Sequence, residues 1–424
     1  MTESAPSRVR LVATTREVDP IEDVLAHADP AHPLAWLRRG EGMIGFGAAA
    51  TISVGGHLAD PAPIPHAGAL ADEWRVVVDA ASVTDEVGLP GTGLIAFGAL
   101  SFDPTSSLPS TLVVPRFVFG RREGRSWITT VVSSDSDDSA TPEAPAPQPW
   151  GPAWSATVGP GALDAAGYQT AVQAALDAIS SGEVSKVVLA RDLVGSVPAG
   201  ADLRRLVRAL TTGYPDVWTY AVDGIIGASP ETLVTVSGGT ITARVLAGTA
   251  PRGADADADT QASVALFASG KDQDEHRFAV ESVLRTLRGH TSALTASEQP
   301  FALKLPNVWH LATDVEGVLR GGASALDLVG ALHPTAAVAG TPTAAALEVI
   351  RRIEPFDRGR YAGPVGWIDA AGDGEWAIAL RSAQFGEGGR ISAHAGAGIV
   401  PGSDPEAELL ETRMKFRPIV DALA

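Results

Sequence analysis

A single lysine stands inside an apolar, β-branched run at residues 185–191, SKVVLAR. The run predicts a buried strand on which Lys186 shares a face with Val188 and Ala190, because side chains alternate along a strand. Burial of an ammonium group is unfavourable unless the group is paired or loses its proton. Desolvation favours the neutral amine, which can act as a base. A lysine that reaches solvent from a strand end is the alternative, and it is the commoner case for such a segment taken alone.

Short strand candidates separated by glycine and proline dominate the chain before residue 133, a pattern typical of antiparallel sheet. They lie at residues 43–46, 74–78, 93–97, 111–119 and 127–132. Residues 131–153 are rich in serine, aspartate and proline, which predicts an exposed loop or linker. We find no motif with chemistry ahead of this loop, so residues 1–155 are expected to serve as a scaffold.

Helix and strand candidates alternate in the second part of the chain, residues 156–424. Apolar residues at helical spacing predict helices at 164–180, 269–289 and 344–352. A last helix is expected to start near Asp404, a good N-cap that is followed by proline. Strands are expected at 185–191, 218–222, 233–236, 240–246, 308–313, 363–368, 376–381 and 391–394.

Composition limits the partners and the compartment. The 424 residues, 45% of them hydrophobic, are enough to bury a large core. A formal net charge of −18 argues against nucleic acid and anionic membranes as partners, and an anionic substrate would need a local cation. With no cysteine, the chain has no thiolate nucleophile and no cysteine metal site. We find no signal core and no apolar run of roughly 18 residues that could span a bilayer, so a cytoplasmic protein is expected.

The last predicted helix brings Glu408, Glu411 and Lys415 to one face, at i, i+3 and i+7. Carboxylate oxygens are the ligands that Mg²⁺ prefers, and the ion usually takes only a few of them together with substrate and water. A solvated face with a salt bridge is the alternative. The same two interpretations apply to Asp272 and Glu275, at i and i+3 of the helix predicted at 269–289.

Three further features have little meaning on their own. The small residues at 395–399, AGAGI, and at 246–249, LAGT, could let a ligand approach the backbone or could be plain turns. Glu231 follows a proline at a bend, where burial would raise the pKa of its carboxyl and make it a general acid, although a surface glutamate is commoner. His310 and His333 are more simply explained as structural histidines.

In their order and spacing, these segments resemble the chorismate-utilising enzyme family, which includes isochorismate, salicylate, anthranilate and aminodeoxychorismate synthases. The resemblance covers residues 164–424 and adds little before residue 156. The matching blocks are SKVVLAR, SPET, LAGT, KDQDEH, LHPTAAVAGTP, RYAGPVGWID, GEWAIALRSA, AGAGIV and the ExxExxxK of the last helix. So many blocks in the family's order make the match specific.

Two features resemble the isochorismate synthase branch of this family. Members that add water at C2 of chorismate have lysine at the position of Lys186, and amine-adding members have glutamine. The block that contains His333 is also similar to isochorismate synthases, and no glutaminase domain is evident in the sequence, which fits water as the nucleophile. The resemblance thus implies conversion of chorismate to isochorismate. A salicylate synthase, which goes on to eliminate pyruvate, and an inactive chorismate-binding paralogue are the alternatives.

The resemblance implies a role for each matching residue. Lys186 would be the general base that activates water, and Glu231 the general acid that protonates the departing C4 hydroxyl. The cofactor would be Mg²⁺, held by Glu275, Glu408 and Glu411. The residues that would contact chorismate are Gly248, Thr249, Ala337, Arg381, Gly396 and Lys415.

The resemblance also implies the fold, a single α+β domain of two stacked, mostly antiparallel sheets with helices on the outside. Residues 1–155 would be a strand-rich part of that fold, with 131–153 as a loop within it, and 156–424 would be the chorismate-binding catalytic region. A monomer is expected, with chorismate as its small-molecule partner. The sequence leaves open whether the product feeds menaquinone or siderophore synthesis.

Overall fold

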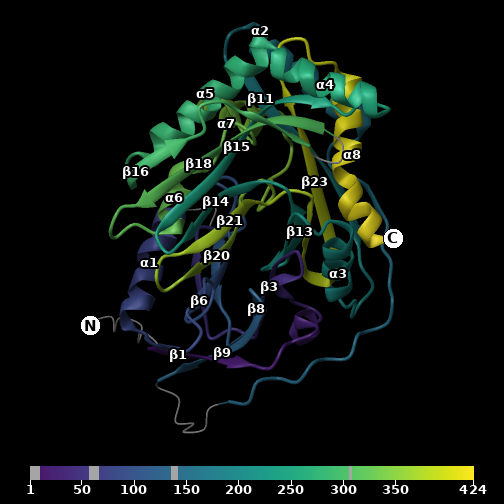
Figure 1. Ribbon diagram of the computed structural model, residues 1–424. Coiled ribbons are helices and arrows are strands. Elements are labelled where there is room, and N and C mark those ends of the chain that lie inside the picture. Colours follow the sequence, from purple (N-terminus) through teal and green to yellow (C-terminus); the bar gives the residue numbers. More distant parts are fainter. Residues whose placement is uncertain (1–9, 57–65, 135–141, 305–307) are drawn as a thin grey trace, which may run out of the picture.

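Two large β-sheets with helices around them form the architecture (Figure 1). The computed structural model describes residues 10–56, 66–134, 142–304 and 308–424, apart from the side chains of Thr249, Lys271, Glu275 and Val308. The fold is α+β with mostly antiparallel sheets, as the sequence predicts. Residues 135–141 of the loop predicted at 131–153 lie outside the described residues.

In the described part of the chain, the first sheet has 13 strands and is antiparallel except where β1 and β5 pair in parallel. Its order is β10-β11-β23-β22-β13-β12-β2-β3-β8-β9-β1-β5, and β19 also pairs with β11. The strands are β1 (Leu11–Val18), β2 (Leu34–Arg38), β3 (Glu41–Phe46), β5 (Ser82–Asp85), β8 (Phe117–Arg122), β9 (Arg125–Ser133), β10 (Val158–Pro160), β11 (Lys186–Ser196), β12 (Trp218–Val222), β13 (Ile225–Ser229), β19 (Gly340–Thr341), β22 (Ser382–Phe385) and β23 (Arg390–Ile399).

The second sheet has 10 strands within the described ranges, in the order β16-β18-β15-β14-β21-β20-β6-β7-β4, and β17 also pairs with β18. The strands are β4 (Ala50–Val54), β6 (Ile95–Ala99), β7 (Ser110–Val114), β14 (Thr232–Ser237), β15 (Thr240–Pro251), β16 (Thr291–Ala296), β17 (Phe301–Lys304), β18 (Val308–Leu319), β20 (Pro364–Asp369) and β21 (Gly374–Ile378). Strands from before and after the 131–153 loop pair directly in both sheets, as β12 does with β2 and β20 with β6.

Large aromatic side chains join the two sheets. Trp36 and Met43 of the first sheet are buried in one apolar cluster with Phe97 and Trp367 of the second. The indole nitrogens of Trp36 and Trp367 both donate to the Glu375 carboxylate, at 2.8 and 3.1 Å. Burial of such large rings contributes much of the stability of the core, and the shared carboxylate satisfies the polar atoms that are buried with them.

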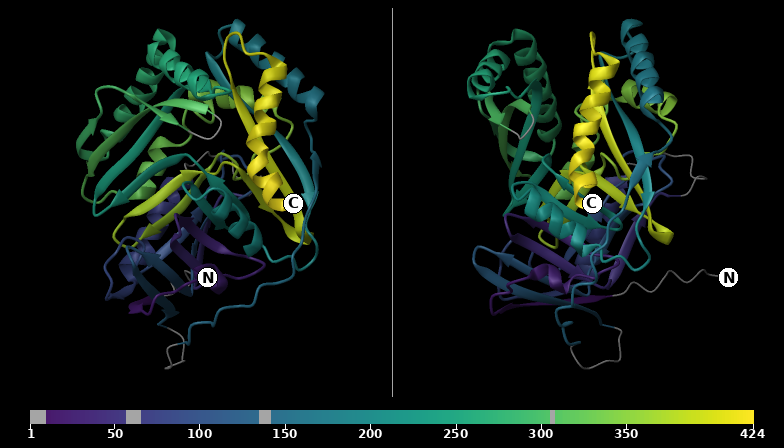
Figure 2. Two further views of the ribbon diagram at one scale, coloured as in Figure 1. Left: turned by 45° about the vertical axis from the view of Figure 1, so that its right-hand side comes forward. Right: turned by 90° about the vertical axis from the view of Figure 1, so that its right-hand side faces the viewer.

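Helices cover the outer faces of the sheets (Figure 2). They are α1 (His66–Ala80), α2 (Ala165–Ser180), α3 (Arg204–Gly213), α4 (Ala256–Ala268), α5 (Gly270–Leu287), α6 (Ala325–Leu332), α7 (Thr343–Ile353) and α8 (Pro405–Leu423), with short 3-10 helices at Val24–His27 and Glu387–Gly389. Helices α2 and α7 pack on β11, α8 packs on β23, and α4 and α5 pack on β15 and β18. Both views in Figure 2 place α4 and α5 on one arm of the molecule and α2 and α8 on the other.

The strand predicted at 74–78 is wrong, because these residues lie in α1. Leu70, Ala71 and Trp74 are buried at helical spacing on one face of α1, which packs against α6. This tertiary packing outweighs the β-propensity of the local valines. The strand predicted at 111–119 is two strands, β7 and β8, which the intervening proline separates.

A buried ion pair occupies part of one edge of β11. Glu354 Oε1 accepts a hydrogen bond from the Ala190 amide at 2.7 Å, and Arg358 Nη2 donates to the Val188 carbonyl at 2.7 Å. The two side chains are almost fully buried and their charged atoms lie 2.6 Å apart. The pair therefore replaces strand hydrogen bonds beside the lysine-bearing end of β11.

Glu354→Gln is expected to lower the free energy of unfolding by about 3–5 kcal/mol, because Arg358 would remain buried without a counter-charge. Urea unfolding followed by circular dichroism measures the loss. Glu348→Gln is the matched control, since this residue lies on α7, which ends directly before Glu354, in an exposed pair with Arg351, and should change stability by less than about 1 kcal/mol. Equal effects of the two substitutions would contradict the role of the buried pair.

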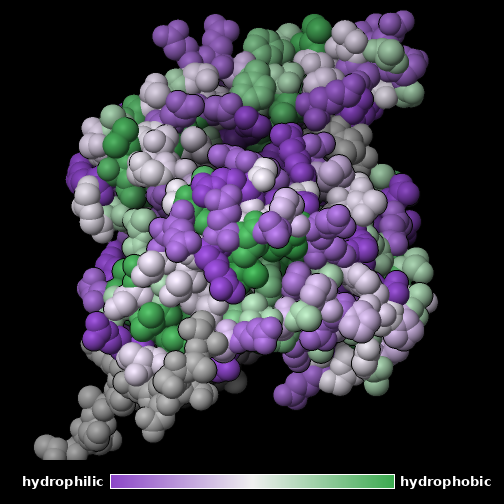
Figure 3. Space-filling model, turned by 60° about the horizontal axis from the view of Figure 1, so that its bottom comes forward, coloured by the Kyte–Doolittle hydropathy of each residue, from purple (hydrophilic) through white to green (hydrophobic). Residues whose placement is uncertain are grey.

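The face of the molecule in Figure 3 is mostly polar, with apolar residues in a few patches among polar ones. Such a mixture is usual for a protein surface. None of the helices in the described ranges is both long and apolar enough to cross a bilayer.

Candidate active site

Lys186 is the first residue of β11, where it pairs with Thr341 of β19. The side chain is half-buried and extends over Gly398 of the neighbouring strand β23. A Cβ atom built on Gly398 would lie 3.2 Å from Lys186 Cε and 3.9 Å from Nζ. Glycine at 398 therefore leaves room for the lysine to lie across the sheet.

Glu231 lies in the bend between β13 and β14. Its amide donates to Ser229 Oγ at 3.2 Å, and Ser229 Oγ donates to the Ile378 carbonyl at 2.6 Å. The Glu231 carbonyl accepts from the Ile378 amide at 3.0 Å, so the backbone of the bend is tied to β21. These contacts fix the carboxyl on a rigid part of the fold.

The Glu231 carboxyl lies within electrostatic reach of Arg381, Lys415 and Lys186. Burial raises the pKa of this carboxyl, and the charges of Arg381, Lys415 and Lys186 act on it in the opposite direction. Burial has the larger effect, so the pKa stays above its ordinary value and favours the protonated acid. Four residues that are far apart in the sequence are thus within electrostatic reach of one another.

Arg381 lies between β21 and β22 and has a left-handed backbone, with φ of 50°. Its carbonyl accepts a hydrogen bond from the Ala228 amide at 3.2 Å, which holds this conformation. Burial lowers the pKa of the guanidinium, and the charges of Tyr361 and Glu231 oppose that effect. No described residue accepts a hydrogen bond from the guanidinium. A left-handed backbone at a residue other than glycine is strained, and such strain is typical of functional sites.

Helix α8 places Lys415 over β23. Lys415 Nζ lies 2.6 Å from Glu411 Oε1 and donates to the Gly396 carbonyl at 2.8 Å. Burial lowers the pKa of this amine, and the Glu411 charge opposes the effect. The helix is tied to β11 by the bond from Arg191 Nε to Thr412 Oγ1, at 2.7 Å.

The carboxylates of Glu408 and Glu411 lie on this same helix. Burial raises the pKa of Glu408, a hydrogen bond from Ser403 lowers it, and the charge of Glu411 raises it again. A divalent cation bound between these two carboxylates would offset the effect of the Glu411 charge on Glu408. Of the predicted metal ligands, Glu275 has its backbone on α5, and its side chain lies outside the described residues.

The LAGT segment is part of β15 and contains an irregularity in register between Ala247 and Thr249. Gly248 has a φ of 75°, and a Cβ there would lie 3.2 Å from Asp272 Cβ of α5. The bulge therefore brings the backbone of β15 close to α5. The side chain of Thr249 lies outside the described residues.

The AGAGI segment belongs to a strand, so the alternative of a plain turn is wrong. Gly396 pairs with Ala190 and Gly398 with Val188 in the antiparallel register of β11 and β23. A Cβ on Gly396 would lie 2.6 Å from the Leu189 carbonyl oxygen, which explains the need for glycine. Ala337, also predicted to line the site, is exposed in the segment between α6 and β19.

Sequence patterns alone do not reveal two further residues near this site. His310 pairs with Thr249 across β15 and β18 and forms a hydrogen bond with the Gly248 backbone. Burial lowers the pKa of His310, and the charges of Lys415 and Arg381 lower it further. His310 therefore lies within electrostatic reach of the candidate site. Tyr361 is buried and forms a hydrogen bond with the Gly396 backbone, and its ring stacks on His394. Tyr361 lies within the matching block RYAGPVGWID, but the block assigns it no role, and His310 lies in no matching block. Each reaches the site only through strand pairing or loop packing.

Known proteins match the chain over most of its length. The family model described as "Chorismate binding enzyme" matches residues 2–424. "Isochorismate synthase EntC" of Escherichia coli K12 is 33% identical over 338 residues, which cover 77% of this chain and 80% of the relative. "Isochorismate synthase DhbC" of Bacillus subtilis is 40% identical over 268 residues, 60% of this chain and 67% of the relative.

A solved structure agrees with these sequence matches. MenF, the menaquinone-specific isochorismate synthase from Escherichia coli, superimposes with a TM-score of 0.77 at 25% identity, over 99% of this chain and 96% of that one. The described fold and the relatives therefore agree over the length of the molecule. This chain belongs to the family of chorismate binding enzymes, on its isochorismate synthase branch.

Proposed function

We propose that the protein is an isochorismate synthase, which adds water at C2 of chorismate and releases the C4 hydroxyl as water. The observation that carries the proposal is that Arg381, Lys415 and Lys186 all act electrostatically on the Glu231 carboxyl, whose pKa burial raises. A protonated acid close to an amine base is the arrangement that such a paired proton transfer requires. The names of the relatives EntC and DhbC support the same activity.

The proposed chemistry assigns opposite proton transfers to two residues. Lys186 takes a proton from the attacking water, since water is a poor nucleophile at neutral pH. Glu231 gives a proton to the departing C4 hydroxyl, since hydroxide is a poor leaving group. Each transfer of this kind contributes typically about 10²–10⁴-fold to the rate.

Substrate binding explains the two remaining cations. Chorismate is a dianion, and the chain has a net charge of −18, so the site must supply local positive charge. Arg381 has no acceptor among the described residues and can hold a planar carboxylate with two parallel hydrogen bonds. Lys415 is already fixed by Glu411 and Gly396, so its remaining proton can meet a second anionic group.

Mg²⁺ fits the donor set of the site. The carboxylates of Glu408 and Glu411 are oxygen ligands of the preferred kind, and the pKa of Glu408 is raised mainly by burial, with the charge of Glu411 acting in the same direction. In the proposal Glu275 of α5 completes the protein ligands. When bound, the ion would neutralise and position the ring carboxylate of the substrate.

Glu411→Gln is expected to raise the Mg²⁺ concentration needed for half-maximal activity by roughly tenfold or more, since one charged ligand would be lost. Glu275→Gln should have the same effect. Titration of initial rates with Mg²⁺ measures it, with Glu406→Gln, an exposed residue on α8, as the matched control. An unchanged titration for both ligand variants would remove these residues from the metal site.

Product analysis tests the proposed function directly. The pure protein, incubated with chorismate and Mg²⁺ and followed by chromatography, should form isochorismate until equilibrium with chorismate is reached. Salicylate and pyruvate without a second enzyme would instead identify a salicylate synthase. Binding of chorismate without any product would identify an inactive binding protein.

The compartment, the oligomeric state and the pathway stay predictions. We propose a cytoplasmic monomer, in line with the sequence. Gel filtration with light scattering tests the monomer. Relatives are named for both menaquinone and other isochorismate pathways, so deletion of the gene and assay of menaquinone and siderophore would assign the pathway.

A further inference from the structure

Arg358 is a buried arginine whose guanidinium binds two segments that border the candidate active site. Glu354 holds the guanidinium in place, since Nε donates to Oε2 at 2.8 Å and Nη2 donates to Oε1 at 2.6 Å. Nη2 also donates to the Val188 carbonyl at 2.7 Å, and Nη1 donates to the Val338 carbonyl at 2.9 Å. These bonds use the fixed directions of a planar fork of donors, which no other side chain offers.

The first of the two segments is the strand that begins with Lys186. Val188 lies two residues further along β11, on the same face as the lysine. The Glu354 carboxylate holds the same edge of the strand through the Ala190 amide. Because β19 and β10 pair with this edge only toward its two ends, the ion pair fills the part of the edge between them. The position of β11 next to Lys186 therefore depends on the ion pair.

The second segment lies between α6 and β19. Its Val338 carbonyl, which Arg358 binds, directly follows Ala337, a residue predicted to contact the substrate. The next carbonyl, that of Ala339, accepts a hydrogen bond from the Val188 amide at 2.8 Å. Arg358 and this backbone bond together fix the distance between the segment and the strand of Lys186.

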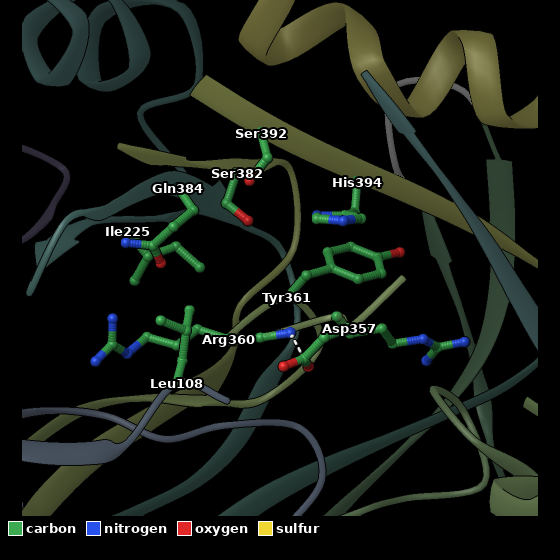
Figure 4. Close-up of a pocket in the computed structure, with 11 residues that line it drawn as sticks. Leu108, Ile225, Asp357, Arg360, Tyr361, Ser382, Gln384, Ser392 and His394 are labelled. Atoms are coloured by element: carbon green, nitrogen blue, oxygen red, sulfur yellow. Dashed lines mark hydrogen bonds between the residues drawn. The ribbon is translucent and has the colours of Figure 1, made fainter. Parts of the chain in front are cut away.

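Tyr361 connects Arg358 with a third element, β23. The Tyr361 amide donates to the Arg358 carbonyl at 3.0 Å, and the centre of its ring lies 6.0 Å from Arg358 Cζ. The ring stacks on His394 of β23, as Figure 4 shows, and Tyr361 also forms a hydrogen bond with the Gly396 backbone. The surroundings of Arg358 thus reach both strands over which Lys186 lies.

We propose that Arg358, held by Glu354, is a positioning residue that fixes the strand of Lys186 against the segment of Ala337. This role rests on the proposed function, in which Lys186 must come within about 2.6–3.2 Å of the water whose proton it takes. A misplacement of about 1 Å can lower a rate by roughly 10²-fold. An ion pair that only stabilises the fold would leave the rate of the folded protein unchanged.

Arg358→Lys tests this role, because lysine keeps the charge beside Glu354 but loses the planar fork that serves both carbonyls. We expect kcat for chorismate to fall roughly 10–100-fold. The KM should change by less than about threefold, since Arg381 and Lys415, the proposed binders of the dianion, lie on other elements. The ratio of kcat in H2O to kcat in D2O should rise, because proton transfer to a displaced Lys186 becomes slower.

Arg204→Lys is the matched control. Arg204 is also fully buried, pairs with Asp202 at 2.7 Å, and donates to the carbonyls of Gln148 and Pro149 at 3.3 and 2.8 Å. It therefore has the same kind of surroundings, but the groups that it binds are not part of the candidate site. We expect a loss of stability in urea unfolding similar to that of Arg358→Lys, with wild-type kcat and a wild-type isotope ratio.

Glu354→Asp is the second variant, for use if circular dichroism shows that Arg358→Lys does not fold. It keeps a carboxylate beside Arg358 but withdraws it from the Ala190 amide, and it should have the same kinetic effects. A wild-type kcat in either folded variant, or an equal loss of kcat in Arg204→Lys, would overturn the positioning role. Failure of both variants of the pair to fold would make the pair purely structural and overturn the role as well.

The wild-type protein separates this inference from the proposed function. If it forms no isochorismate from chorismate and Mg²⁺, the proposed function itself fails. An active wild-type enzyme whose Arg358→Lys variant keeps its rate is a different result, which removes only the positioning role.

Discussion

Lys186→Ala should lower kcat for the conversion of chorismate by roughly 10²–10⁴-fold, the usual contribution of a general base. The residue is half-buried over Gly398 and lies within electrostatic reach of the candidate acid Glu231. Binding of chorismate and Mg²⁺ should persist, because Arg381 and the carboxylates of α8 are unchanged. Initial rates by chromatography and binding by calorimetry separate the two effects.

Lys304→Ala is the control for this change. Lys304 lies on β17 with an exposed amine that pairs with Asp259, and its loss should leave kcat unaltered. A Lys186→Ala variant with near wild-type kcat would remove Lys186 from the mechanism. Loss of chorismate binding instead of kcat would make Lys186 a substrate-binding residue and not the base.

Glu231→Gln should reduce kcat by a similar factor of roughly 10²–10⁴, since the amide has the same shape and cannot give up a proton in this way. In the wild-type protein, burial raises the pKa of the Glu231 carboxyl. The protonated form is the active one, so activity is present below that pKa and is lost as the pH rises through it. The pH profile of kcat/KM should therefore fall on its alkaline side, at a pH above the ordinary range for a glutamic acid.

Glu316→Gln, an exposed position on β18, serves as the matched control and should keep both the rate and the pH profile. Glu231→Asp keeps an acid at the bend and should retain a pH-dependent alkaline loss at a lower rate. If Glu231→Gln retained the wild-type rate and its alkaline limb, the acid would have to be another group.

Local patterns in the sequence predict much of the secondary structure. The helix at 164–180 is α2, with Asp164 capping it through the Gly167 amide, and the last helix begins at Pro405 after Asp404. These elements carry their signals in neighbouring residues. The strand predicted at 74–78 is wrong because burial of Trp74 against the rest of the fold favours a helix there. This burial depends on tertiary packing and is not a local property.

The candidate site likewise contains some residues that the sequence reveals and others that only the tertiary structure reveals. Residue types and spacing single out Lys186, Glu231 and the carboxylates of the last helix, and the resemblance to a family gives each a role. Tyr361 and His310 receive no role from these signals, although Tyr361 lies in a matching block, and they reach the site by stacking, hydrogen bonding and strand pairing.

The sequence by itself determined the family, most helices and strands of the second half, and which side chains carry chemistry, because these depend on residue identity and short-range spacing. Only the tertiary structure decided that Lys186 lies across Gly398 and that Arg381 and Lys415 act on a buried Glu231. The physical reason is that electrostatic coupling and desolvation depend on distances through space. Those distances follow from the register of β11 with β23 and from the packing of α8 upon them.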